Sequence, residues 1–162
     1  MVYANRGQHA WGNPTQQGLI DKYLHGIDFA IKHNYPTNTF IKENFDKDLL
    51  HKNNIFVDED VQKRNMSQIS VLNGNCKGTL LFDGFSVCDI YVRHDSEVTI
   101  DCSQYCKVFI NVYDRAKVNV NPKGYSIGIC LHSWRRLYCG NRWGCHAKKK
   151  PGLMSGFIIF SK

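Results

Sequence analysis

The sequence contains no apolar run long enough to cross a bilayer. Its longest candidate, GLMSGFIIFSK at the C-terminus, holds only a handful of apolar residues, whereas a transmembrane helix needs about 20. The N-terminal MVYANRGQHAWGNP also lacks an apolar stretch of signal-peptide length. These two absences predict a soluble, unexported chain and hence a cytoplasmic location.

Signatures of common enzyme classes are also missing. There is no Gly-rich phosphate loop, no G-x-S-x-G and no H-E-x-x-H. His94 and Asp95 are adjacent, and Asp114 follows His94 by twenty residues, so a regular fold could align them along one edge. Polar residues are expected in turns in any case. We therefore expect no enzyme and no cofactor, with a site at His94, Asp95 and Asp114 left open.

Acidic residues are absent from residues 132–162, which carry seven Lys or Arg. Proteins bind nucleic acids through cationic side chains that contact phosphates and through aromatic rings that stack on bases. This segment contains both kinds of residue. An acidic protein partner, or simple solubilisation, explains the same composition. The candidate binding residues are Trp134, Arg135, Arg136, Tyr138, Arg142, Trp143, Lys148, Lys149 and Lys150.

The seven cysteines form an odd set, and three fall within predicted strands. This pattern favours reduced, buried thiols over a disulfide framework. The C-terminal Cys and His residues include no C-x2-C or H-x3-H pair. We therefore expect no metal, and Cys139, Cys145 and His146 are only weak candidates for ligands.

Helical spacing dominates the N-terminal third of the chain. Residues 1–16 are rich in Gly, Asn and Gln and indicate an extended arm. Apolar residues then recur at helical spacing from Gln17 to about His33. Thr15, Thr37 and Asp46 are suitable N-caps for this helix and for two shorter ones. Residues 17–62 thus form a helical segment that ends in a connecting strand.

A twenty-residue repeat occupies residues 68–132. Phe85, Tyr105 and Tyr125 are twenty residues apart, and the apolar positions of the strands between them recur with the same offset. Each copy holds a longer strand (87–93), a polar turn and a shorter strand (97–101). The offset predicts interior columns at 88/108/128, 90/110/130, 92/112/132, 98/118 and 100/120.

Such short repeats cannot bury their own apolar face, so copies must stack. We predict a mainly β protein: a small parallel β-solenoid of three to four coils, capped by the N-terminal helices. Rings 85, 105 and 125 would form a column of offset stacks. An evenly spaced β-meander or sandwich is the alternative. Residues 133–162 form a basic aromatic tail beyond the repeat.

The stretches FIKENFDKDLLHKNNIFVDEDV, GFSVCDIYVRH and VFINVYDRAKV resemble a family of short proteins of Bacteroides-type gut bacteria and their phages and mobile elements. The resemblance covers about residues 37–131. It implies the kind of genome in which the gene occurs, but no known activity. It adds virion association to the possible locations.

Three functions remain open from the sequence. The first is a non-enzymatic structural or interaction protein that acts by self-assembly or by binding a protein partner, for example as a phage particle or accessory component. The second is nucleic-acid binding through the basic tail. The third is carbohydrate binding or processing, which depends on outward-facing Tyr91, Phe109 and Tyr113.

Overall fold

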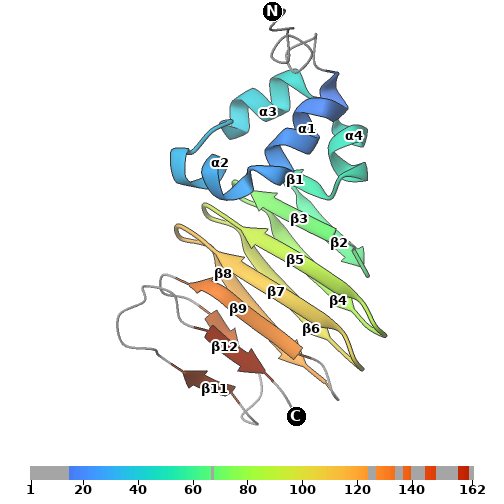
Figure 1. Ribbon diagram of the computed structural model, residues 1–162, viewed down its shortest axis with the longest axis vertical. Coiled ribbons are helices and arrows are strands. Elements are labelled where there is room, and N and C mark those ends of the chain that lie inside the picture. Colours follow the sequence, from blue (N-terminus) through green and yellow to red (C-terminus); the bar gives the residue numbers. More distant parts are fainter. Residues whose placement is uncertain are drawn as a thin grey trace, which may run out of the picture. The chain divides into compact units, whose positions relative to one another are not determined.

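The computed structural model describes residues 15–66 and 68–123 with their side chains. Beyond them it describes the backbone of 127–133, 137–139, 145–148 and 157–160. The chain divides into two compact units, Met1–Leu50 and His51–Lys162. The first is helical and the second is built of stacked strands (Figure 1).

Four short helices run through the N-terminal part: α1 (Gln16–His25), α2 (Ile27–His33), α3 (Asn38–Asn44) and α4 (Lys47–Lys52). The three predicted caps are confirmed. Thr15 Oγ1 accepts from the Gly18 N–H at 3.1 Å, Thr37 Oγ1 from the Phe40 N–H at 3.2 Å, and Asp46 Oδ1 from the Leu49 N–H at 2.9 Å.

The single helix predicted from Gln17 to His33 is wrong in one respect. It is interrupted at Gly26, whose φ of −102° and ψ of 27° lie outside the helical region. Glycine is among the poorest helix formers, so the backbone leaves the helical conformation at Gly26. The helical spacing of the apolar residues nevertheless continues from α1 into α2, which is why the sequence predicted one helix. A role for these helices as the cap of the β-stack stays a prediction.

Two sheets form the second unit. One sheet holds the odd-numbered strands together with β12, in the order β1-β3-β5-β7-β9-β12-β11, and the other holds the even-numbered strands from β2 to β10, in the order β10-β8-β6-β4-β2. The strands are β1 (Ile55–Val57), β2 (Asp60–Arg64), β3 (Gln68–Asn73), β4 (Lys77–Phe82), β5 (Val87–Val92), β6 (Glu97–Cys102), β7 (Lys107–Val112), β8 (Lys117–Pro122), β9 (Ile127–Ser133), β10 (Leu137–Cys139), β11 (Cys145–Lys148) and β12 (Phe157–Phe160).

The predicted parallel β-solenoid is confirmed. Strands β3, β4, β5 and β6 each pair in parallel with the strand one coil later, at an offset of twenty residues, as in Cys88 with Val108 and Val98 with Val118. The residues expected to form one connecting strand instead form β1 and β2, which add a shorter coil before β3 and β4. After β9 the pairing changes, because β12 and β11 join antiparallel.

Each coil consists of two equal halves, so the predicted longer and shorter strands are wrong. Strands β4 to β9 begin ten residues apart, and β5 and β6 have six residues each. Both strands end in the same four-residue turn. In each of the five described turns between β3 and β8 the second residue has a positive φ, from 56° to 80°: Gly74, Gly84, His94, Gln104 and Asp114.

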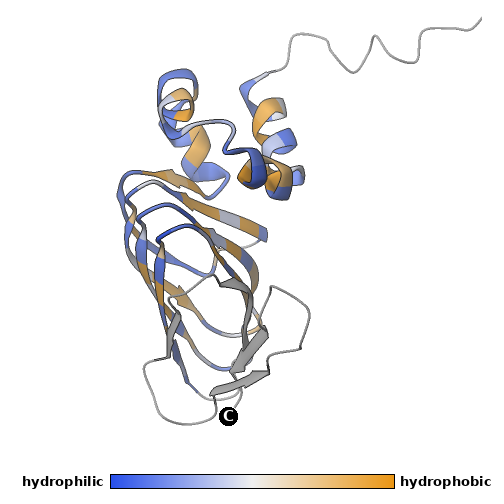
Figure 2. Ribbon diagram, turned by 90° about the vertical axis from the view of Figure 1, so that its left-hand side faces the viewer, coloured by the Kyte–Doolittle hydropathy of each residue, from blue (hydrophilic) through white to orange (hydrophobic). Residues whose placement is uncertain are grey.

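Alternate strand residues fill the interior. Figure 2 shows hydrophobic and hydrophilic segments alternating along the strands of both sheets. The predicted columns 88/108, 90/110, 92/112, 98/118 and 100/120 are all paired across coils and exposed by 3% or less. Burying an aliphatic side chain of this size contributes about 1.5–3 kcal/mol, so these columns are the main source of stability.

One predicted column is wrong at its last member. Gly128 and Cys130 continue columns 88/108 and 90/110, but His132 pairs with Asn111, and Ser133 takes the place beside Val112. A register shift between Ile110 and Asn111 causes this change. One extra residue in β9 forms a bulge, which a fixed offset of twenty cannot anticipate.

The backbone of the first coil lies very close to that of the second coil at Gly78. Its φ is +150°, and a Cβ built on it would lie 1.8 Å from the carbonyl oxygen of Val61, with which it is paired. Because the obstacle is backbone, Gly78→Ala should lower the free energy of unfolding by about 1–3 kcal/mol or more, measured by urea denaturation. The same change at Gly18, inside α1, should be neutral or stabilising by up to about 1 kcal/mol. Equal effects at the two sites would contradict the close approach.

Candidate functional site

Most of the basic and aromatic residues predicted to bind lie outside the described residues: Trp134, Arg135, Arg136, Arg142, Trp143, Lys149 and Lys150. For the others the backbone is described, with Tyr138 and Cys139 in β10, and Cys145, His146 and Lys148 in β11. Strand β10 belongs to the five-stranded sheet and β11 to the seven-stranded one. The weak metal candidates are thus divided between two sheets, and the nucleic-acid hypothesis stays a prediction.

Two sets of turns border the solenoid. We call turns 73–76, 93–96 and 113–116 the first turn edge, and turns 83–86 and 103–106 the second turn edge. Within each edge, equivalent turns are hydrogen-bonded through the backbone. The Arg115 N–H donates to the His94 carbonyl at 2.9 Å, and the Tyr105 N–H donates to the Gly84 carbonyl at 3.0 Å. The edges are therefore continuous surfaces with one turn per coil.

The candidate catalytic residues His94 and Asp114 do come together on the first turn edge, where they join coils. The Gly74 N–H donates to His94 Nδ1 at 3.0 Å, and the His94 N–H donates to Asp114 Oδ2 at 3.1 Å. Burial, followed by the nearby Arg93 guanidinium, lowers the pKa of His94. A neutral ring with Nδ1 unprotonated is what the bond from Gly74 requires.

Asp95 is also engaged between coils. Arg115 donates to both of its carboxylate oxygens, from Nε at 2.6 Å and from a terminal nitrogen at 2.7 Å. This bidentate bond lowers the pKa of Asp95. Paired charges of this geometry specify the alignment of neighbouring turns, although the pair is exposed and screened by solvent.

A second polar network starts from Asp83, on the second turn edge. Its carboxylate accepts from Asn65 Nδ2 at 2.5 Å and pairs with the Arg64 guanidinium. The bond from Asn65, followed by that from Arg64, lowers the pKa of Asp83. Asn65 Oδ1 in turn accepts from the Asp83 N–H at 2.8 Å. Asp83 is therefore held as a carboxylate between two coils.

Two aromatic rings project from the same edge. Phe85 and Tyr105 stack with centroids 5.4 Å apart and planes inclined by 7°, which confirms this part of the predicted ring column. Tyr125 lies outside the described residues. Phe85 is 83% exposed and Tyr105 is 55% exposed. The pair thus presents apolar surface to solvent at the tips of adjacent turns.

A groove of about 270 Å³ is lined by residues from four successive coils. The first residues of the two second-edge turns, Asp83 and Ser103, line the groove. The third residues of the same turns are the stacked rings. The lining combines cations, carboxylates, a hydroxyl and apolar carbon: Arg64, Leu81, Phe82, Asp83, Asp101, Cys102, Ser103 and Lys123. Sequence reasoning missed this set, although the twenty-residue spacing of 83, 103 and 123 was available as a signal.

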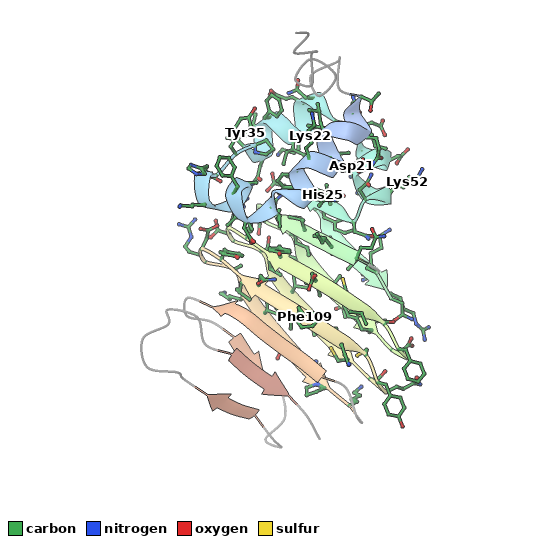
Figure 3. The ribbon with its side chains drawn as sticks, viewed as in Figure 1. Asp21, Lys22, His25, Tyr35, Lys52 and Phe109 are labelled. Atoms are coloured by element: carbon green, nitrogen blue, oxygen red, sulfur yellow. The ribbon has the colours of Figure 1, made fainter. Side chains whose placement is uncertain are left out.

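The rings named for the carbohydrate hypothesis lie elsewhere. Phe109 is on the seven-stranded sheet (Figure 3) and is partly buried. The rings of Tyr91 and Tyr113 stack on one another, with centroids 6.5 Å apart, and both are partly buried. These three rings are less exposed than the Phe85–Tyr105 pair, so the second turn edge is the better candidate site.

No family model, curated protein or solved structure matches the chain. Within residues 15–66 and 68–123, no group of three or more His, Cys, Asp or Glu side chains is arranged to hold a metal ion. The helices that the structure describes include none long and apolar enough to span a membrane. The candidate site therefore has to be interpreted from its own geometry.

His94 makes the stability of the first turn edge depend on pH. Its folded-state pKa is below the ordinary value of 6.5, so folding favours the neutral ring. The stability that this provides is fully present above pH 6.5 and is lost as the pH falls through the folded-state pKa. His94→Asn, which tolerates the positive φ, should therefore flatten this part of the pH profile of unfolding free energy, measured by urea denaturation.

Gln104→Asn, at the equivalent position of the second turn edge, is the control because it changes no titrating group. It should leave the shape of the profile unchanged. The charged neighbours of His94, which are Asp58, Arg93, Asp95 and Asp114, are present in both variants. A profile that keeps its full slope below pH 6.5 in His94→Asn would show that another group is responsible.

Proposed function

We propose that the protein is a non-enzymatic interaction protein, in which the β-solenoid is the scaffold and the second turn edge binds a partner. The observation that carries this proposal is the exposed Phe85–Tyr105 pair, whose turns also line the groove. Aromatic residues are enriched at the energetic centres of protein interfaces. A partner that covers both rings would remove their exposed apolar surface from water, and this burial would stabilise the complex.

These rings contribute little to the fold itself. The interior is filled by strand residues and by the last residues of four described turns, Cys76, Ser96, Cys106 and Ala116. An aromatic pair of this geometry adds about 0.5–1.5 kcal/mol beyond its buried area, and most of the Phe85 surface is not buried. A smaller polar residue would meet the requirements of the turn equally well.

The first turn edge supports a non-enzymatic function. The residues there that resemble catalytic groups are occupied in joining coils: His94 with Gly74 and Asp114, and Asp95 with Arg115. Their pKa shifts follow from these bonds and from burial. Structural ion-pair networks commonly perturb pKa values in this way.

A solenoid is well suited to binding without catalysis. Parallel strands hold equivalent residues of successive coils about 4.8 Å apart, so groove and rings are positioned before a partner arrives. Such preorganisation reduces the entropic cost of association. In the phage setting that the sequence resemblance suggests, the partner would be another particle or accessory protein.

The test compares Phe85→Ala/Tyr105→Ala with Phe29→Ala, a control in α2 that removes a ring of similar exposure, 68%. Purified products of the neighbouring genes are the first partners to measure, by biolayer interferometry. We expect wild type and control to bind equally, and the double variant to bind roughly 30-fold more weakly, the effect of losing a hot spot of about 2 kcal/mol.

Thermal melting of the double variant must match that of wild type, so that weaker binding is not a loss of fold. Equal binding by all three proteins would move the interface away from the second turn edge. A turnover measured with the purified protein, abolished by replacing His94 or Asp95, would overturn the non-enzymatic assignment.

A further inference from the structure

Three aromatic rings form a row on the helical unit. Tyr35 lies in the connection between α2 and α3 (Figure 3), Phe40 lies in α3, and Phe45 follows its last residue. The ring centroids of Tyr35 and Phe40 are 6.1 Å apart, and those of Phe40 and Phe45 are 6.4 Å apart. We call these three residues the aromatic row. Its middle ring has a neighbouring ring on each side.

The aromatic row is not part of the buried interior of the helical unit. The buried apolar side chains there are aliphatic and are exposed by 7% or less: Ile20, Ile27, Ala30, Ile41 and Leu50. In contrast, Tyr35 is 62% exposed and Phe40 is 40% exposed, while Phe45 is partly buried. Adjoining apolar side chains in solvent mark a binding surface more often than single ones do. The row therefore offers a surface that the described helices leave uncovered.

Residues 1–14 join the helical unit beside this row. Gln16, the first residue of α1, uses its side-chain amide to hold the two backbone groups that flank Phe45. Its Nε2 donates to the Asn44 carbonyl at 3.1 Å, and its Oε1 accepts from the Asp46 N–H at 3.1 Å. The chain that precedes Gln16 therefore starts next to the Phe45 end of the aromatic row.

This N-terminal segment carries side chains suited to covering the row. Residues 1–14 contain Tyr3 and Trp11 and no Asp or Glu. Trp11 precedes Thr15 by four residues, and four extended residues span up to about 14 Å. Because Phe45 and Phe40 are only 6.4 Å apart, Trp11 can reach the middle of the row. An indole packed there would contact several rings at once.

One further exposed Phe, Tyr or Trp ring, Phe29 in α2, lies within residues 15–50 and serves as a comparison. It is 68% exposed, and its ring faces His33 at 4.3 Å. Phe29 has no ring contact with the aromatic row among the described residues. A side chain that covers Phe29 would meet one neighbouring ring, whereas the aromatic row offers three in succession.

We propose that residues 1–14 fold back on the helical unit and that the Trp11 indole covers the aromatic row, in contact with Phe40. Tryptophan suits this position because it buries a large ring while its N–H stays at the rim. The Gln16 side chain holds the segment at one end of the row, so Trp11 is present at a high effective concentration. The aromatic row is thus a binding surface for a segment of the same chain, separate from the second turn edge.

The fluorescence of Trp11 tests this contact. Phenylalanine replaces the other two tryptophans, Trp134 and Trp143, so that Trp11 is the only indole of the full-length protein. Its quenching by acrylamide is compared with that of a free peptide of residues 1–15. We expect Trp11 to emit at a shorter wavelength and to be quenched less in the protein, equally at all protein concentrations. Protection that disappears on dilution would assign the contact to a second copy and overturn the proposal.

Variants identify the surface that protects Trp11. Tyr35→Ala/Phe40→Ala should shift the equilibrium about tenfold toward the peptide-like state, roughly the effect of losing two aromatic contacts. Phe29→Ala is the matched control and should leave the quenching unchanged. Circular dichroism of both variants must show intact helices, and the comparison of protein with peptide stands even if a variant unfolds. Equal quenching in protein and peptide, or unchanged protection in a folded double variant, would overturn the proposal.

Discussion

The parallel register between coils is the constraint on which the rest of the structure depends. Backbone hydrogen bonds continue from the strands into the turns, as where the Ser103 N–H donates to the Phe82 carbonyl at 2.8 Å and the Tyr113 N–H donates to the Val92 carbonyl at 2.9 Å. Because side chains alternate between the two faces of a strand, a slip of one residue would move every interior side chain outward. The core, the turn edges and the groove therefore exist only in this register.

Charged side chains on the outside reinforce the same register. One outer column reads Asp60, Lys77, Glu97 and Lys117 across four coils, so each charge faces opposite charges. Each exposed pair adds little stability alone, but a one-residue shift between the later coils would place Glu97 and Lys117 beside uncharged residues. Strand β2 ends the five-stranded sheet, and its exposed Asp60, Lys63 and Arg64 discourage pairing with another chain.

Periodicity explains which features could be predicted from the sequence. The interior columns followed from the twenty-residue offset, because stacked coils must place equivalent residues above one another. The same reasoning was wrong where the backbone departs from strict repetition, at the break at Gly26 and at the bulge in β9. It also missed that each coil has two equal halves, because the turn residues with positive φ vary from glycine to His94, Gln104 and Asp114. Only the backbone conformation is common to them.

Sites were harder to predict than the fold because they arise where the repeat constrains chemistry least. Strand interiors are filled mainly by apolar residues, and the last position of each described turn holds a small one. The third turn position is exposed in all five described turns and is therefore free to vary. The ring of Phe85 occupies this position, and the groove residue Asp83 is the partly buried first residue of the same turn.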